Sequence, residues 1–387
     1  MENVIYMDHA ATTPTDPEVL KAMEPWFDVQ YGNPATLYSL GLLASQVVEE
    51  SRSAVADVLG ADPAEIYFTS GGTESNNWAI KGVADAHQKK GRHLITSTIE
   101  HHAILEPLEF LEKRGYEVTR VPVDGAGLVD PDAVRRAIRP DTILISIMHA
   151  NNEVGTIEPI AEIGAVAREA GVLFHTDAVQ SVAKIPVKVA DLNVDILSLS
   201  AHKFYGPKGV GALYLAKRVR VTPLLHGGAQ ERRRRAGTLN VPGIVGLAKA
   251  IHKTADQMEA EAARESALRD RLWEGLRERI PHIYLNGHPT QRLPNALNFR
   301  VEGIEGEAMI LCLDMNRVGV SSGSACTTGS LEPSHVLLAM GIAAEHAHGS
   351  IRMTLGRANT QEDIDYVIDT FPGIVARLRE MSPVYNK

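Results

Sequence analysis

The sequence predicts an α/β protein with a large domain on a mostly parallel sheet and a smaller α+β domain on its C-terminal side. Short apolar runs alternate with helix-period patterns from residue 66 to residue 175, which favours parallel strands with helices on both faces. A long helical pattern runs from about Val241 to Arg279 and is predicted to bridge the two domains. Beyond it, short strand patterns mix with helical ones, as in an α+β unit.

The expected elements follow one another without an internal repeat. Residues 1–14 are predicted to form an extended lead-in, and residues 16–60 to be helical apart from a polar turn at residues 31–34. The later strands are expected at residues 66–69, 93–97, 116–121, 142–148, 172–175, 196–199, 212–215, 295–301 and 351–355. The later helices are expected at residues 74–88, 103–114, 130–138, 160–170, 241–279, 306–315 and 360–378. Ligands of such sheets bind at the carboxyl ends of the strands, so the residues there are the site candidates.

Composition and charge narrow the class of protein. The 387 residues carry a net charge of −9, which argues against nucleic acid or an anionic membrane as a partner. No apolar stretch is long enough to span a bilayer, and the N-terminus lacks the pattern of a signal peptide. The two cysteines, Cys312 and Cys326, form neither a disulfide framework nor a zinc-type spacing. We therefore expect a cytoplasmic protein with reduced thiols.

A lysine follows the strand pattern at residues 196–199. Ser200, His202 and Lys203 come first, and a glycine-rich turn comes next. The pKa of a lysine falls readily on burial, which suits such a residue to Schiff-base chemistry. The alternative is a snorkelling lysine in front of a Gly-Pro hairpin.

A possible anion cradle follows the strand pattern at residues 66–69. The turn SGGTESNN, residues 70–77, places two glycines and a threonine between a strand and a helix. Exposed amides, the positive end of the helix dipole and a hydroxyl group would attract a phosphate. Ordinary capping by Thr73 or Ser75 is the alternative. The turn is neither a P-loop nor a dinucleotide fingerprint.

Polar residues follow three other strand patterns. Asp177 and Gln180 follow the strand at 172–175, where an acid could hold a proton on a heteroaromatic nitrogen and an amide could reach a ring oxygen. Capping by Asp177 is the alternative. The run at residues 149–153 adds amide and carboxylate groups to the same edge. His101 and His102 are adjacent and would point to opposite faces of a strand, so acid–base or stacking work by one of them is favoured over a shared metal.

These candidates converge on one cofactor. A phosphate cradle, an acid for a ring nitrogen and a Schiff-base lysine are the parts that pyridoxal 5′-phosphate requires. Asp177 and Lys203 lie on successive strands, close enough to flank it.

The cysteines differ in their surroundings. Cys326 lies in SSGSACTTGS, residues 321–330, which has no apolar anchor and predicts a mobile loop. An exposed thiol there could be a nucleophile that travels to its target, or an accidental surface cysteine. Cys312 lies in MILCL and is predicted to fill the core.

These stretches together resemble one family. The sequence is similar to the group I cysteine desulfurases of the NifS/IscS type, which are fold-type I pyridoxal-phosphate enzymes. Six stretches carry the resemblance: SSGSACTTGSLEPSHVL, SAHKFYGPKGVGALYL, FTSGGTESNNWAIKG, HTDAVQS, YMDHAATTP and GTLNVPGIVG. The resemblance implies a large domain at residues 15–257 with a mostly parallel seven-stranded sheet. The small domain would comprise residues 1–14 and 258–387 and carry an active-cysteine loop at about residues 321–333.

The resemblance also implies a role for each matching residue. Lys203 would hold the cofactor's aldehyde, Asp177 its pyridinium nitrogen and Gln180 its phenolic oxygen. His101 would stack on the ring and move protons, and Asn152 would lie at the cofactor's edge. The phosphate would be held by Gly72, Thr73, Ser200 and His202, with Thr238 reaching over from the second subunit of a homodimer. Substrate binding is assigned to Asn33, Asn152 and Arg352, with Arg357 as the other candidate for the carboxylate clamp.

The implied reaction removes sulfur from L-cysteine, releases L-alanine and leaves a persulfide on Cys326. The sulfur would pass to an acceptor or iron–sulfur scaffold protein, and Cys326 could ligate a cluster transiently, with no metal of the enzyme's own. Selenocysteine lyase and aminotransferase activities are the alternatives, and a non-catalytic sulfur scaffold is a third. The basic run at residues 232–235 is predicted to be a solvated loop rather than an acceptor-docking patch.

Overall fold

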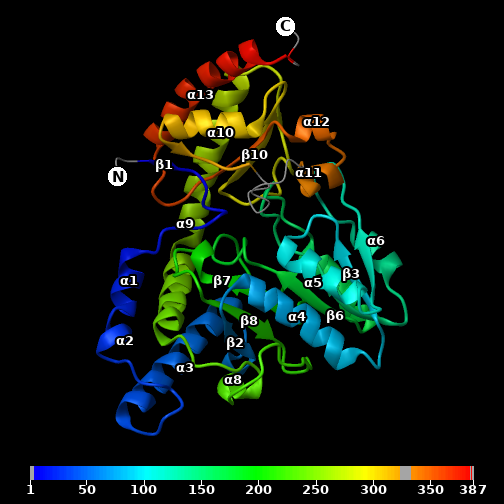
Figure 1. The fold of residues 1–387 in the computed structure, drawn as a ribbon, viewed down its shortest axis with the longest axis vertical. Helices are drawn as coiled ribbons and strands as arrows, with labels where there is room; N and C mark the ends of the chain where they lie inside the picture. Colours follow the sequence, from blue (N-terminus) through cyan, green and yellow to red (C-terminus); the bar gives the residue numbers. More distant parts are fainter. Residues whose placement is uncertain (1–3, 323–332, 384, 386–387) are drawn as a thin grey trace.

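The computed structural model describes residues 4–322, 333–383 and 385 (Figure 1). Its strands are β1 (Ile5–Tyr6), β2 (Ile66–Thr69), β3 (His93–Ser97), β4 (Glu117–Val121), β5 (Thr142–Ser146), β6 (Leu173–Asp177), β7 (Ile196–Ser200), β8 (Gly211–Leu215), β9 (Ile283–Leu285), β10 (Ala296–Val301), β11 (Val318–Gly319) and β12 (Ser350–Thr354). Its α-helices are α1 (Pro17–Met23), α2 (Pro25–Asp28), α3 (Ser39–Leu59), α4 (Gly72–His87), α5 (His102–Glu112), α6 (Pro131–Ala137), α7 (Ile160–Ala170), α8 (Gln230–Arg233), α9 (Val241–Arg279), α10 (Gly306–Met315), α11 (His335–Ala339), α12 (Ala344–Ala347) and α13 (Gln361–Met381).

The central sheet has seven strands in the order β2-β8-β7-β6-β5-β3-β4. The strands from β7 to β4 pair in parallel, and β8 is antiparallel to both of its neighbours, β7 and β2. The predicted mostly parallel sheet of seven strands is therefore confirmed. The parallel strands end at one edge of the sheet, where their carboxyl ends bring distant residues together.

Helices cover both faces of this sheet because successive side chains of a strand point to opposite faces. Leu94, Leu144 and Ile196 pack with residues of α4 and α5 in one buried cluster. Their neighbours Ile95 and Leu197, which point the other way, belong to a larger cluster with α1, α3, α6, α7 and the first half of α9. Strands β3, β5 and β7 are buried along their whole length, as expected between two helical layers, whereas the edge strand β4 is partly exposed.

A second core lies in the C-terminal part of the chain. It surrounds the antiparallel sheet β12-β10-β9, between α10, α13 and the second half of α9. Helix α9 enters the first core through Ile244 and Ile251, and enters the second through Leu272 and Leu276, so it joins the two (Figure 1). Strand β1 pairs with β11 and thereby ties the N-terminal segment to the second core. The division of the chain at residues 14/15 and 257/258 stays a prediction.

The observed elements depart from the expected ones in several places. The helical region before residue 60 is broken over residues 29–38, a longer gap than the predicted turn at 31–34. Strand β6 continues to Asp177, two residues beyond the expected end. Strands β1, β9 and β11 and helices α11 and α12 were not predicted, because two to five residues are too few to show a periodicity. Within the described residues, no helix is long and apolar enough to cross a membrane.

Candidate active site

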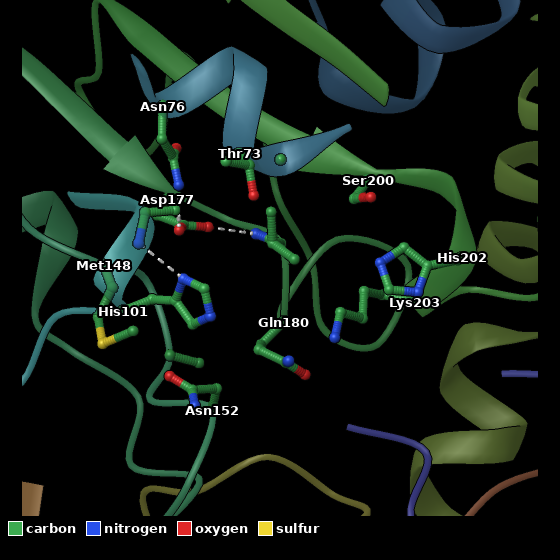
Figure 2. Close-up of a pocket in the computed structure, with 14 residues that line it drawn as sticks. Thr73, Asn76, His101, Met148, Asn152, Asp177, Gln180, Ser200, His202 and Lys203 are labelled. Atoms are coloured by element: carbon green, nitrogen blue, oxygen red, sulfur yellow. Dashed lines mark hydrogen bonds between the residues drawn. The ribbon is translucent and has the colours of Figure 1, made fainter. Parts of the chain in front are cut away.

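A cavity of about 230 Å³ opens at the carboxyl-end edge of the parallel strands, beside the first turn of α4 (Figure 2). Every residue predicted to bind the cofactor, except Thr238, lines it. These residues are Gly72, Thr73, His101, Asn152, Asp177, Gln180, Ser200, His202 and Lys203. The parallel sheet brings them together from segments more than 100 residues apart, as the strand-end rule requires.

Asp177 is the last residue of β6 and is 6% exposed. Its Oδ2 accepts a hydrogen bond from Nδ2 of Asn76 at 2.6 Å, and its Oδ1 accepts one from the backbone N–H of Val179 at 3.0 Å. Two donors therefore hold the carboxylate in one orientation at the cavity wall (Figure 2). Asn76 was not predicted, although its position four residues after Gly72 on a helix places both residues on one face.

The first turn of α4 forms the cradle at the other end of the cavity. Gly71 has a φ of 147°, a conformation that side chains rarely adopt, and it precedes the helix. A Cβ atom on Gly72 would lie 2.7 Å from Cγ2 of Val179, so no larger residue fits there without a shift. The backbone amides of this turn and the hydroxyl groups of Thr73 and Ser200 lie around the cradle (Figure 2).

Lys203 follows β7 and also lines the cavity. Its Nζ donates hydrogen bonds to the carbonyl oxygens of Ala10 at 2.6 Å and Ala11 at 2.8 Å. His202 is neutral at neutral pH, because burial, aided by the charge of Lys203, lowers its pKa to about 4. The segment around Ala10 is thus part of the site, and its contacts with Lys203 span more than 190 residues of sequence.

His101 caps the first turn of α5 with its ring. Its Nδ1 accepts a hydrogen bond from the backbone N–H of Ala103 at 3.0 Å. Burial lowers the pKa of His101, so the neutral ring is favoured, and the bond at Nδ1 places its proton on Nε2. The prediction that His101 and His102 point to opposite faces of a strand is wrong, because neither residue lies on a strand. Strand β3 ends at Ser97, and His102 is the first residue of α5.

The donors and the shape of the cavity fit pyridoxal 5′-phosphate. A glycine cradle at a helix start, a fixed carboxylate and a lysine amine line one cavity, and they match the phosphate, the ring nitrogen and the aldehyde of that cofactor.

Comparison with known proteins agrees with this fit. Residues 5–367 match the model of the family described as aminotransferase class-V. The chain belongs to this family. Its members use pyridoxal phosphate, so the predicted family and cofactor are confirmed.

Two relatives and two solved structures share most of the chain. A protein named "Cysteine desulfurase IscS" from Methanosarcina thermophila is 56% identical, over 99% of this chain and 95% of its own. A protein of the same name from Dictyoglomus turgidum is 54% identical, over 99% and 97%. A solved "NIFS-LIKE PROTEIN" has a TM-score of 0.92 at 40% identity, over 97% of this chain and 100% of its own. A structure described as "SspA in complex with cysteine" has a TM-score of 0.80 at 39% identity, over 91% and 98%.

The two arginines predicted as candidates for the carboxylate clamp have different surroundings. Arg352, on β12, donates from Nη1 to the carbonyl oxygen of Asn152 at 2.9 Å and pairs with Asp8 at 2.8 Å. Its buried Nε has no hydrogen-bond partner among the described residues. Arg357 instead faces a second cavity, where Asp16 lies 3.3 Å from Nη1 and the ring of Tyr205 lies 4.3 Å away. Arg352 is therefore the one beside the cofactor cavity.

Among the described residues, two predicted site residues, Thr238 and Asn33, lie away from this cavity. Thr238 is exposed in the segment between α8 and α9. Asn33 lines a different cavity together with Glu231 and Leu239, and its Oδ1 accepts a bond from Ala35 at 3.0 Å. Cys326, and the predicted mobility of its loop, lie outside the described residues.

Two surface predictions need correction. The prediction of a solvated loop at residues 232–235 agrees with the exposure of Arg232 and Arg233, but not with Arg235, which pairs with Glu74 at 2.8 Å. Cys312 is half-buried at the edge of the second core rather than inside it, and its Sγ lies 3.5 Å from Nη2 of Arg377. The helical period of α10 turns the neighbouring Leu311 outward, which the apolar composition of MILCL conceals.

Proposed function

We propose that this chain is a cysteine desulfurase: it removes sulfur from L-cysteine, releases L-alanine and leaves the sulfur as a persulfide on Cys326. The single observation that carries the proposal is the convergence of Lys203, Asp177 and the Gly72 cradle on one cavity. The whole-chain similarity to proteins named cysteine desulfurase, and the relative solved with cysteine, support the choice of substrate.

In this proposal, the cavity holds the cofactor in one orientation. Gly72 and Thr73, with Ser200 and His202, would hold the phosphate, and Asp177 would hold the ring nitrogen. Bound pyridoxal phosphate supplies an aldehyde for an amine and an electron sink for the carbon that loses a proton. The carboxylate of Asp177 serves this sink by keeping a proton on the ring nitrogen, and the bonds from Asn76 and Val179 keep it aimed there.

Two groups would move protons beside the substrate. Lys203, once free of its contacts with Ala10 and Ala11, can take the α-proton at Nζ and return it. His101 offers a proton from Nε2, because its Nδ1 is engaged by Ala103. His101 can therefore accept the proton of a thiol only after it has given up its own.

Arg352 is the proposed clamp for the substrate carboxylate, with Asn152 beside it. A guanidinium fork suits a carboxylate, and the salt bridge to Asp8 fixes its plane. The main chain of Arg352 also pairs with Ser321 at 2.7 and 3.2 Å, at one base of the segment that carries Cys326. At the other base, Ser334 donates to Glu153 at 2.5 Å, next to Asn152. Both bases lie beside the proposed substrate position.

The proposed assembly is a homodimer with shared sites. Asn33 lines a cavity with Leu239, the residue after the exposed Thr238, and neither Asn33 nor Thr238 lines the cofactor cavity, which suits a contribution to the site of a second copy. Large apolar side chains near Asn33 support a covered surface: Leu37 is 89% exposed and Tyr38 is 60% exposed. A sulfur acceptor or iron–sulfur scaffold protein, and a location in the cytoplasm, complete the proposal.

The deciding experiment supplies the purified protein with L-cysteine and a thiol reductant and measures alanine and sulfide. We expect the two products in equal amounts. Amino transfer to pyruvate without sulfide would instead indicate an aminotransferase, and a much faster rate on selenocysteine would indicate a selenocysteine lyase. A protein without a visible cofactor band and without products would indicate a sulfur scaffold.

A further inference from the structure

Lys184 lies behind the cofactor cavity and contacts Gln180. Its Nζ lies 3.3 Å from Oε1 of Gln180, which is four residues earlier in the chain. On its other side, the amide of Gln180 donates from Nε2 to the carbonyl oxygen of Ala10 at 3.0 Å. Gln180 is 6% exposed and lines the cofactor cavity, whereas Lys184 lines a second, smaller cavity that shares Lys203 with the first.

These two neighbours determine which way the amide of Gln180 points. An ammonium group can only donate hydrogen bonds, and a backbone carbonyl can only accept them. A flipped amide would set its NH₂ group against the ammonium of Lys184. It would also set its oxygen against the carbonyl oxygen of Ala10, so both contacts would become repulsive. Oε1 must therefore face Lys184. The amide nitrogen carries a second N–H besides the one given to Ala10.

Lys184 stays mostly protonated at neutral pH, although its surroundings lower its pKa. Burial and the charge of Lys203 lower its pKa to about 8, and the carboxyl group of Glu265 opposes this shift. Glu265 lies on α9, lines the same small cavity and is 8% exposed. Burial raises the pKa of Glu265 to about 7, so this acid compensates the charge of Lys184 only in part at neutral pH.

We propose that Lys184 is a positioning residue: it orients the amide of Gln180 so that Nε2, not Oε1, is offered to the ring oxygen of pyridoxal phosphate. The inference rests on the proposed placement of Gln180 at that oxygen. Without Lys184, the amide can turn and present its own oxygen to the oxygen of the cofactor, and the hydrogen bond is lost.

The test compares two ligands on the full chain after its cofactor has been removed. One is pyridoxal 5′-phosphate, and the other is its 3-deoxy analogue, which lacks the ring oxygen. We expect Lys184→Met to lower the preference for pyridoxal phosphate about tenfold, the effect of one buried hydrogen bond. Its affinity for the analogue should stay unchanged. Gln180→Leu should lower the preference by the same factor. The double variant Lys184→Met/Gln180→Leu should lower the preference no further than either single variant does.

A control variant separates this role from a structural one. Lys188→Met removes an exposed lysine whose Nζ donates to the backbone carbonyls of Asp57 and Val58, and this variant should keep the preference for pyridoxal phosphate. If Lys184→Met does not fold, the double variant Lys184→Met/Glu265→Gln leaves no uncompensated buried charge and carries the same expectation.

Two outcomes would overturn the proposal, and they are distinguishable. If Lys184→Met keeps the full preference for pyridoxal phosphate over the analogue while Gln180→Leu loses it, Lys184 does not orient the amide. A full preference in Gln180→Leu would show that Gln180 is not at the ring oxygen, and the placement itself would fail.

Discussion

Replacing Glu231 with Gln should destabilise the large domain by about 3 kcal/mol, at the lower end of the range for a broken buried ion pair. The carboxylate of Glu231 is 4% exposed and accepts three hydrogen bonds: two from Arg52, at 2.9 and 2.7 Å, and one from the backbone N–H of Phe68 at 2.9 Å. A glutamine would set its NH₂ group against one of these donors and leave Arg52 without its buried counter-charge. Glu49, which is 63% exposed, still reaches Arg52 at 3.1 Å, so the lower end of the range applies.

The same contacts hold a strained turn. Glu231, Arg232 and Arg233 all have a positive φ, of 43°, 57° and 64°. Each such residue costs about 1–2 kcal/mol in backbone energy, so the turn persists only while its side-chain contacts hold it. The turn leads to Thr238, the residue proposed to act in the second subunit. Glu231→Gln should therefore also loosen the backbone of the arginine run at residues 232–235 and make it easier for trypsin to cleave.

Thermal unfolding and limited trypsin digestion measure these effects. We expect Tm to fall by at least about 6 °C and cleavage at the arginine run to become faster. Glu169→Gln is the matched control: Arg135 and Glu169 lie as close, at 2.6 Å, but their side chains are 50% and 68% exposed. Many exposed pairs contribute nothing measurable, so this variant should keep its Tm. Equal shifts in Tm for the two variants would refute the argument from burial.

The remaining predictions concern the reaction. Lys203→Ala should fold but lose the attachment of cofactor to chain on borohydride reduction, and a cofactor still fixed by borohydride would exclude Lys203. Asp177→Ala should bind the cofactor yet turn over cysteine at less than about a hundredth of the normal rate, as expected for a lost positioned proton partner, and near-normal turnover would contradict its role. A mixture of Lys203→Ala and Thr238→Ala chains should regain activity in heterodimers with one intact site, whereas a fully active monomer in sedimentation would rule out shared sites. Cys326→Ser should lose sulfide production while Cys312→Ser keeps it, and brief exposure of the unaltered protein to cysteine should add about 32 mass units, one sulfur atom, to the peptide of Cys326.

The positions of the main site residues could be predicted from the sequence. Lys203, Asp177 and the Gly72 turn each follow an apolar strand pattern, and the strands alternate with helices. Parallel strands end at one edge of a sheet, so a local pattern is enough to infer that residues far apart in the chain meet there. The residues predicted to bind the cofactor, apart from Thr238, line one cavity, and their roles there stay predictions.

The exposure of individual side chains was harder to predict. Residues 232–235 have the composition of a solvated loop, yet Arg235 pairs with Glu74, which lies 161 positions earlier. Cys312 has apolar neighbours in sequence, but the face of α10 that meets the core decides its burial. Charge and apolar runs describe a segment, whereas burial depends on what packs against it.

The contacts that orient the site were decided only by the tertiary structure. Lys203 meets Ala10, Asp177 meets Asn76, Gln180 lies between Ala10 and Lys184, and Arg352 pairs with Asp8 across 344 positions. Local sequence determines the residue types at the strand ends, because the strand and turn patterns are local. The direction of each hydrogen bond depends on which distant backbone or side chain lies within about 3 Å, and only the packed fold determines that distance.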